Sequence, residues 1–364
     1  MKLQEIVKVL ENFAPPSLQE SYDNSGLLVG DPGLMVSGVL ITLDVTEEVL
    51  QEAKARGCNL VISHHPLIFK GLKRLTGRGM VERLVMRAIR DDIALYAAHT
   101  NLDSVEKGVS ATLARRLGLL NTRILSPRKG LLRKLVTFCP GSHAEQVKAA
   151  LFSAGAGHIG KYDCCSFSSV GEGTFRAGEG ANPFVGEPNS LHHEAEIRIE
   201  TFYPGYAEPE ILRALKTAHP YEEVAYDLYP LENIHHHLGF GMYGELKEAV
   251  DALDFMAFLK ERTQTGCIRH TELLGKKIRK VALCGGSGSF LISEAIASGA
   301  DVFITGDVKY HDFFEAENRL VIMDIGHYES EQFAKVLLLE QIQEKFPTFA
   351  SFISGVDTNP VHYF

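Results

Sequence analysis

The chain has 364 residues, and because domains cluster at about 100–150 residues, we expect two or three of them. Its 45% hydrophobic and 23% charged residues are typical of a globular protein and exclude a largely disordered chain. The formal net charge of −9 argues against a general nucleic-acid binder, which needs a basic surface to displace counterions from phosphates.

No stretch approaches the roughly 18 apolar residues of a membrane span, and the N-terminal residues have no apolar segment typical of a secretion signal. We therefore expect a cytoplasmic protein with no membrane partner. The six cysteines include no CxxC pair, so we interpret them as buried reduced thiols rather than disulfides or a zinc knuckle.

The first segment alternates helix and strand. Residues Leu3–Phe13 have the apolar spacing of a helix, and Thr46 is placed to cap another. Short apolar runs separated by helices predict α/β layering with a largely parallel sheet. The predicted strands are Gly38–Asp44, Asn59–Ser63 and Ile93–Ala97.

The last segment repeats this pattern and predicts a second α/β half. In both halves a predicted strand runs into a histidine-bearing turn, at Ser63–His65 and at Asp324–His327. Ligands of open α/β sheets bind at such strand ends, so the two halves are expected to face one cleft. The predicted strands of this half are Lys280–Cys284, Val302–Thr305 and Leu320–Met323, and the predicted helices include Phe290–Ala297 and Ser330–Lys345.

The middle of the chain has a different rhythm. Leu135–Cys139 and Ala195–Thr201 alternate as half-exposed strands, each followed by a helix and another strand-like run. This repeated β-α-β pattern predicts an inserted ferredoxin-like α+β domain. We accordingly divide the chain into an N-terminal α/β half at residues 1–126, the inserted domain at 127–237, and a C-terminal α/β half at 238–364 that completes one metal-binding unit with the first.

Candidate metal ligands lie at the predicted strand ends. His64 and His65 are adjacent, so their side chains point in different directions and can serve separate ions. Asp103 follows the next strand and offers a hard oxygen ligand near the same sheet edge. His327 and Glu331 are four residues apart on one helical face, and a carboxylate can bridge two ions about 3.5–4 Å apart.

Other strand ends carry polar residues whose role the sequence leaves open. Asp44, His99 and Asp307 are either partners of the metal ligands or local caps, and His99 or Asp307 could carry a proton in catalysis. The turn Cys284–Ser289 fits either an anion-binding loop or a tight strand-to-helix turn. We interpret the run His235–His237 as an exposed linker.

Several motifs together resemble the Nif-three-like dinuclear metal family, whose members are called GTP cyclohydrolase I type 2 homologues, and the resemblance covers nearly the whole chain. In the two halves the motifs are Asp23–Gly30, Ser63–Pro66, His99–Asp103, Thr305–Asp307 and Gly326–Glu331. In the middle they are Gly155–Gly160, Gly180–Pro183 and His219–Glu223, as in the long bacterial form, whose inserted domain is similar to PII and CutA proteins.

The resemblance implies a ligand set of His64, His65, Asp103, His327 and Glu331. It further implies that Glu331 bridges, with His65 and Asp103 on one ion and His64 and His327 on the other. It also implies a homohexamer built as a pair of trimers.

Two hypotheses follow. The first is a metal-dependent hydrolase acting on a nucleotide, phosphoester or cyclic amide, and the second is a metal-binding or regulatory assembly protein that senses a small molecule through its inserted domain. Mixed imidazole and carboxylate ligands suit zinc, which we expect first, and also iron or manganese.

Overall fold

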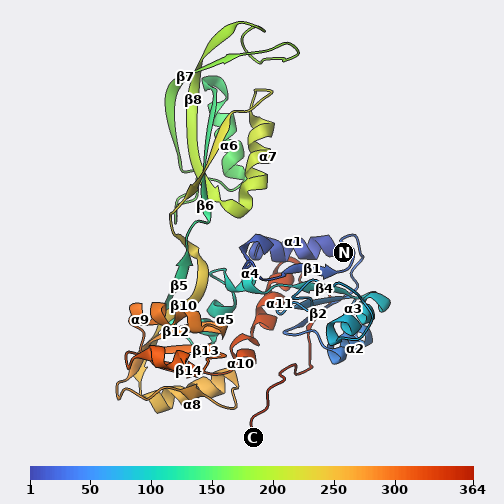
Figure 1. The fold of residues 1–364 in the computed structure, drawn as a ribbon, viewed down its shortest axis with the longest axis vertical. Helices are drawn as coiled ribbons and strands as arrows, with labels where there is room; N and C mark the ends of the chain where they lie inside the picture. Colours follow the sequence, from blue (N-terminus) through green and yellow to red (C-terminus); the bar gives the residue numbers. More distant parts are fainter. The chain divides into compact units, whose positions relative to one another are not determined.

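The computed structural model describes residues 1–364, which form two compact units (Figure 1). One unit combines Met1–Pro127 with His236–Phe364, and the other is Arg128–His235. The first unit is therefore discontinuous in sequence. No helix in either unit is both long and apolar enough to cross a membrane.

The first unit is a mixed α/β structure, as the alternation of helix and strand predicts. Its N-terminal elements are α1 (Leu3–Phe13), η1 (Pro16–Leu18), β1 (Gly26–Val29), β2 (Val39–Thr42), α2 (Glu47–Ala55), β3 (Leu60–Ser63), α3 (Met80–Arg90), β4 (Ala94–Ala97), α4 (Thr100–Asp103), α5 (Val109–Arg116) and β5 (Leu120–Arg128). Its C-terminal elements are β10 (His235–Val250), α8 (Ala252–Thr263), β11 (Arg269–His270), β12 (Ile278–Ser287), η4 (Ser289–Leu291), α9 (Ile292–Ala297), β13 (Val302–Gly306), η5 (Asp312–Ala316), β14 (Val321–Asp324), α10 (His327–Glu331), α11 (Ala334–Lys345) and β15 (Ser351–Ile353).

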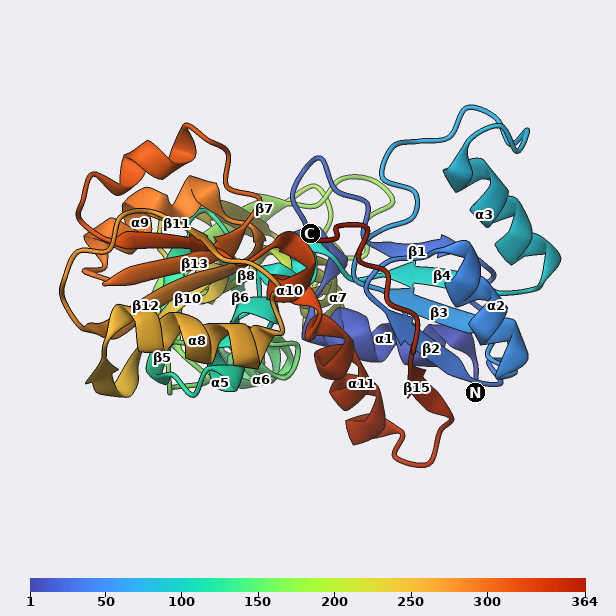
Figure 2. The same cartoon turned by 90° about the horizontal axis from the view of Figure 1, so that it is seen from below.

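The first sheet has the strand order β1-β4-β3-β2-β15, in which only β1 runs antiparallel to its neighbour. Successive residues of its strands face opposite sides: Leu60 and Ile62 pack with α1 and α11, whereas Val61 packs with α2 and α3. Both faces are thus covered by helices, as a parallel sheet requires (Figure 2). The strand β15 comes from the C-terminal segment, so both halves of the sequence contribute to this sheet.

The second sheet has the order β11-β14-β13-β12-β10-β5, with β12, β13 and β14 parallel. Val281 and Leu283 pack with α5 and α8 on one face, and Ala282 packs with α9 on the other. The residues His235–His237, expected as a linker, instead begin β10. His237 pairs there with Glu106 through a hydrogen bond of 2.7 Å.

The second unit contains β6 (Leu132–Pro140), η2 (Gly141–His143), α6 (Ala144–Ser153), β7 (Ser166–Arg176), β8 (Leu191–Pro204), η3 (Gly205–Ala207), α7 (Glu208–Ala218) and β9 (Tyr226–Leu231). Its strands form an antiparallel sheet of order β7-β8-β6-β9. Helices α6 and α7 cover one face of the sheet, where Val147 and Leu215 join Leu135 and Ile199 in the core (Figure 1).

The interpretation of all cysteines as buried thiols is wrong in part. All six are free, but only Cys58, Cys139 and Cys284 are buried, whereas Cys164 and Cys267 are exposed. The exposed cysteines lie in loops, outside the helices and strands.

Candidate metal centre

The N-terminal half places its candidate ligands at the carboxyl ends of two neighbouring parallel strands. Ser63, the last residue of β3, is in register with Ala97, the last residue of β4. His64 and His65 follow Ser63 directly, and Asp103 lies at the end of the short helix α4 after β4. The parallel pairing of the strands therefore brings these side chains to one edge of the sheet.

The C-terminal half contributes α10, which begins immediately after a glycine turn. Gly326 has a φ of +94°, a conformation that side-chain-bearing residues rarely adopt, and it connects β14 to His327. Gly306 at the end of β13 is equally constrained, because a β-carbon there would lie 2.8 Å from backbone atoms of His327. One helical turn after His327, Glu331 points into the same site.

Glu331 lies between His64 on one side and the pair His65 and His327 on the other. Its Oε2 lies 3.0 Å from Nε2 of His65 and 3.0 Å from Nε2 of His327, and these two nitrogens are 3.2 Å apart. Its other oxygen, Oε1, lies 3.7 Å from Nε2 of His64, which in turn is 3.8 Å from Oδ1 of Asp103. The two oxygens of one buried carboxylate thus face different imidazoles.

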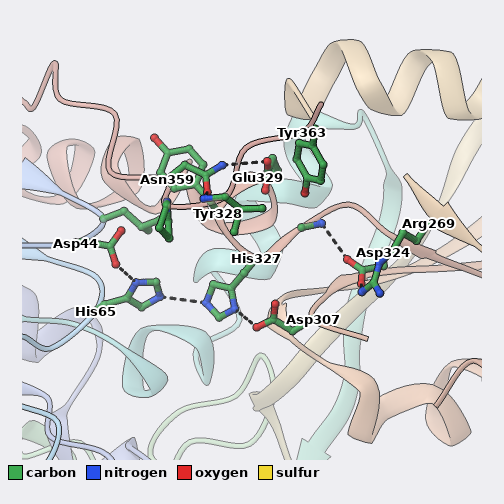
Figure 3. Close-up of a pocket in the computed structure, with 14 residues that line it drawn as sticks. Asp44, His65, Arg269, Asp307, Asp324, His327, Tyr328, Glu329, Asn359 and Tyr363 are labelled. Carbon is green, nitrogen blue, oxygen red and sulfur yellow. Dashed lines mark hydrogen bonds and ion pairs between the residues drawn. The ribbon is translucent and has the colours of Figure 1, made fainter. Parts of the chain in front are cut away.

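In each of these three histidines the ring nitrogen Nδ1 contacts an oxygen acceptor that holds the ring in place. Nδ1 of His65 is 2.7 Å from Oδ1 of Asp44, and Nδ1 of His327 is 2.8 Å from Oδ2 of Asp307 (Figure 3). Nδ1 of His64 is 2.7 Å from the carbonyl oxygen of Ala98. When Nδ1 donates to these acceptors, the lone pair of the neutral ring is on Nε2 and points into the centre, as in metal-ligating histidines.

The electrostatics of the centre favour positive charge within it. Burial alone would lower the pKa of His65, but the carboxylates of Asp44 and Glu331 outweigh burial and raise it to about 10. Burial is likewise outweighed at His327, where Glu331 and Asp307 raise the pKa to about 9. The surrounding histidines hold the pKa of Glu331 well below its usual range despite its burial. Burial raises the pKa of Asp103 to about 7.

These residues fit a metal ion by their donor atoms. Nε2 of His64 and Oδ1 of Asp103 are buried without a hydrogen-bond partner, which is costly unless a ligand satisfies them. Close groupings of donor atoms occur at His64, Asp103 and Glu331, at His65, His327 and Glu331, and at His64, His65 and His99. Imidazole and carboxylate donors within 4.8 Å of one another could hold a metal ion.

In the structure the proposed ligands are grouped differently from the assignment to two ions that the resemblance implies. His64 lies with Asp103, and His65 lies with His327, because the imidazole of His65 turns toward α10 while that of His64 turns toward α4. Asp44 and Asp307 act as partners of the histidines rather than as local caps alone. Thr46, not Asp44, caps α2.

The sequence interpretation did not single out Asp23, which holds His99. Oδ1 of Asp23 is 2.7 Å from Nδ1 of His99, and the backbone and hydroxyl of Thr100 donate to Oδ2. The carboxylate of Asp23 is fully buried. The sequence signals were its place in the polar run Asp23–Gly26, which also fits an ordinary turn, and in the family-like motif Asp23–Gly30, neither of which indicates a contact with His99.

The glycine turn after the apolar part of β12 closes over Glu331. The backbone nitrogen of Gly286 donates to Oγ of Ser330 at 2.8 Å, and a β-carbon at Gly286 would lie 2.1 Å from Oε1 of Glu331. The absence of a side chain at Gly286 therefore leaves space for the carboxylate of Glu331. Cys284 of the same turn is buried, and burial raises the pKa of its thiol.

Two cavities adjoin the centre, and His327 lines both. The first, of about 450 Å³, contains His65, Arg269, Tyr328 and Tyr363, with the C-terminal residues along one side (Figure 3). Arg269 pairs there with Asp324. The second cavity, of about 480 Å³, is lined by residues of both halves, namely Tyr22, His99, Asp103, Phe240, Phe290 and Glu331 among others.

Comparison with known proteins agrees with this architecture. The Duf34/NIF3 (NGG1p interacting factor 3) family matches residues 1–360. A Bacillus subtilis protein named GTP cyclohydrolase 1 type 2 homolog is 38% identical over 367 residues, covering 98% of this chain and 97% of the relative. A Halalkalibacterium halodurans protein of the same name is 39% identical over 362 residues, covering 98% of this chain and 97% of the relative.

Solved structures give the same result. The crystal structure of a Bacillus cereus protein related to NIF3 has a TM-score of 0.85 at 40% identity and covers 100% of this chain and 99% of that one. A Staphylococcus aureus protein of solved structure has a TM-score of 0.78 at 32% identity, with coverage of 100% and 99%. With the resemblance thus confirmed over its whole length, the chain belongs to the Duf34/NIF3 family.

Proposed function

We propose that this protein binds two divalent metal ions and is a metal-dependent hydrolase of a nucleotide, phosphoester or cyclic amide. The observation that carries the proposal is Glu331, whose two oxygens face different imidazoles. His64, Asp103 and Glu331 would hold one ion, and His65, His327 and Glu331 the other.

The donor set supports zinc first and iron or manganese as alternatives, since imidazole nitrogen and carboxylate oxygen suit all three. A pair of such ions supplies Lewis acidity and can stabilise both the attacking and the leaving oxygen of a displacement. The carboxylates of Asp44 and Asp307 orient His65 and His327 and increase their basicity.

His99 is the residue that we assign to proton transfer. A ring nitrogen of His99 lies within 4.8 Å of those of His64 and His65, while its Nδ1 is held by Asp23. A histidine oriented by a buried carboxylate beside a reacting group is a suitable general acid or base. Asp307 is less suited to this role, because its carboxylate already pairs with His327.

The substrate class is proposed from the cavities and from the names of the relatives. Tyr22, Phe240 and Phe290 give the second cavity aromatic surfaces against which a flat ring could pack, next to Asp103 and Glu331. Relatives that share 38% and 39% identity are named GTP cyclohydrolase 1 type 2 homolog. A purine nucleotide is therefore the first substrate to test.

The second candidate is a regulatory metal-binding protein. The unit Arg128–His235 has the order β-α-β-β-α-β, with the sheet order β7-β8-β6-β9, which supports the proposal of a ferredoxin-like, PII- or CutA-like insertion. This unit has a cavity of its own, of about 410 Å³. In either case we propose a cytoplasmic homohexamer, arranged as a pair of trimers.

The experiment that tests the first proposal is elemental analysis of gently purified protein, followed by a hydrolysis screen of nucleotides, phosphoesters and cyclic amides. Close to two divalent ions per chain and metal-dependent turnover are expected. Two ions with no turnover in the whole screen would favour the regulatory candidate. A chain that retains no divalent ion even after incubation with zinc, iron or manganese would contradict both.

A further inference from the structure

A cavity in the unit Arg128–His235 is lined only by residues of that unit, whereas every residue of the metal centre belongs to the other unit. Its volume is about 410 Å³, within the range of pockets that bind small molecules. Its lining residues come from the end of β7, the segment that follows β7 in the hairpin with β8, Glu196 of β8 and the loop after α7. Two motifs that the metal site leaves unexplained, Gly180–Pro183 and His219–Glu223, contribute to it.

The walls of this cavity are aromatic. The ring of Tyr221 is close to two phenylalanines, with centroid distances of 6.4 Å to Phe175 and 6.2 Å to Phe184. The rings are inclined to one another by 53° and 47°, so they form walls instead of a flat stack. Phe184 is 50% exposed, so part of its ring is accessible to a ligand in the cavity.

The carboxylate of Glu196 also lines the cavity, next to Tyr221. The phenol of Tyr221 donates a hydrogen bond of 2.8 Å to Oε1 of Glu196. On the neighbouring strand β7, a β-carbon at Gly173 would lie 2.2 Å from Oε2 of Glu196, so glycine at this position leaves room for the carboxylate in its present orientation. Glu196 and Gly173 both line the cavity.

The charge balance of the lining is negative. The charged residues that line the cavity are Glu196, Glu222 and Glu223 on the acidic side and Arg176 on the basic side. A carboxylate or phosphate ligand would meet net repulsion, whereas a cation would be attracted by the acids and by the faces of the rings. Glu222 also accepts a hydrogen bond of 2.9 Å from the backbone nitrogen of Asn182, which connects the two loops of the cavity.

Tyr221 is fixed before any ligand arrives. Its backbone nitrogen donates to Nδ1 of His219 at 3.1 Å, and Nε2 of His219 is 2.9 Å from the carbonyl oxygen of Phe138. His219 must therefore be the neutral tautomer that donates from Nε2 and accepts at Nδ1. The rings of His219 and Tyr221 also pack with their centroids 5.0 Å apart. A wall fixed in this way loses little entropy when a ligand binds.

We propose that this cavity binds a small organic ammonium ion, held against the rings of Phe175, Phe184 and Tyr221 and balanced in charge by Glu196. The aromatic faces attract the cation electrostatically without the need for a hydrogen bond, and the carboxylates repel anions. The inference goes beyond the proposed hydrolase, because every residue that it uses lies in the unit Arg128–His235.

The test compares ammonium ions with a neutral molecule of the same shape. Choline, tetramethylammonium and putrescine are titrated into the full chain by calorimetry and by ligand-detected NMR, together with 3,3-dimethyl-1-butanol, the uncharged analogue of choline. Saturable binding of at least one ammonium ion is expected, and choline should bind about tenfold more tightly than its neutral analogue. Equal affinity for the two, or no saturable binding of any ammonium ion, would overturn the proposal.

Substitutions inside and outside the cavity test whether the ammonium ion binds there. Phe184→Leu and Glu196→Gln should each weaken ammonium binding several-fold, while Glu172→Gln serves as the matched control because it removes a carboxylate from the same hairpin outside the cavity. Phe184 is half exposed, so its variant keeps the test valid if Glu196→Gln fails to fold. Binding that is unchanged in Phe184→Leu, or weakened equally by Glu172→Gln, would show that the site is elsewhere.

Discussion

A β-carbon at Gly286 would lie 2.1 Å from Oε1 of Glu331, so the absence of a side chain at one residue provides the space for the carboxylate of the other. The two residues are far apart in the sequence, and the turn that contains Gly286 packs on the helix of Glu331. This relationship gives the glycine turn a structural role that can be tested without touching any proposed ligand.

We expect Gly286→Ala to lose metal, because the new methyl group displaces the Glu331 carboxylate. Elemental analysis would measure the loss. Gly275→Ala is the matched control: Gly275 has a φ of +67°, close to the +62° of Gly286, but its β-carbon would meet nothing within 4 Å. Both changes carry a backbone strain of about 1–2 kcal/mol, so the two variants differ in the contacts of the new methyl group with Glu331 and, at 3.4 Å, with Cε1 of His327. Equal metal content in the two variants would show that metal binding does not depend on the space that Gly286 leaves for the Glu331 carboxylate.

The two donor groups predict different losses from single substitutions. Glu331→Gln should reduce both ions, because Glu331 belongs to both groups, whereas His64→Ala and His327→Ala should each remove mainly one. Glu329→Gln, a buried carboxylate on the same helix but outside the groups, should keep the metal content of the wild type. The idea of a bridging carboxylate fails if Glu331→Gln retains one ion at full occupancy.

The sequence was sufficient to predict the parallel strands and the residues at their ends. The runs Leu60–Ile62 and Val302–Ile304 are apolar throughout because both faces of each sheet are covered, and such runs are easily recognised. The polar residues that follow them then fall at the carboxyl edges of the sheets. His64, His65, Asp103, His327 and Glu331 were found in this way, and the structure brings them together.

The partners of the ligands were harder to predict, because they depend on contacts between distant segments. Asp23 is 76 residues from His99, and no local pattern indicates that the two meet. The short strand β15 was not predicted either, since its three residues follow a helix and carry no periodic signal. Its position beside β2 comes from tertiary packing on α11, not from a preference of the sequence.

Metal binding should release protons and strengthen with pH. The pKa values of His65 and His327 are raised to about 10 and about 9 in the absence of metal, so both rings are mostly protonated at neutral pH. A metal ion must displace those protons, and its apparent affinity should therefore keep rising up to about pH 10 instead of levelling near the ordinary histidine value of about 6.5.

Calorimetry of zinc binding at pH 7 in two buffers with different ionisation enthalpies would count the protons. About two per chain are expected from His65 and His327 and about half of one from Asp103, whose pKa is about 7, and His65→Ala should lower the count by about one. A binding enthalpy that does not depend on the buffer would contradict the protonated state of the metal-free centre.

Removal of Arg128–His235 should leave the metal content intact, because all proposed ligands belong to the other compact unit. The flanking strands β5 and β10 are neighbours in one sheet, so a short glycine-serine linker can join them. Circular dichroism would establish that the shortened chain folds, and elemental analysis would follow its metal. A folded deletion variant without metal would mean that the inserted unit contributes to the centre.

Asp23→Asn should destabilise the protein in a pH-dependent way. Burial alone would raise the pKa of Asp23, but hydrogen bonds from His99 and Thr100 outweigh it and hold the pKa well below its usual range. A carboxyl group whose pKa is lowered on folding stabilises the folded state above its unfolded pKa of about 3.9, and that contribution is lost as the pH falls toward the folded value. At pH 7 we expect a loss of about 1.5–3 kcal/mol, the range for a buried hydrogen bond to a charged group.

Urea unfolding of metal-free protein at pH 7 and at pH 3 would measure this effect. The difference between the wild type and Asp23→Asn should be smaller at pH 3, because the wild-type carboxylate then contributes less, while all other acid-sensitive groups are common to both proteins. Asp163→Asn, at an exposed position, should differ little from the wild type at either pH. A difference for Asp23→Asn that stays constant between the two pH values would show that Asp23 acts through its shape, not its charge, and the orientation of His99 by an ionised carboxylate would have to be abandoned.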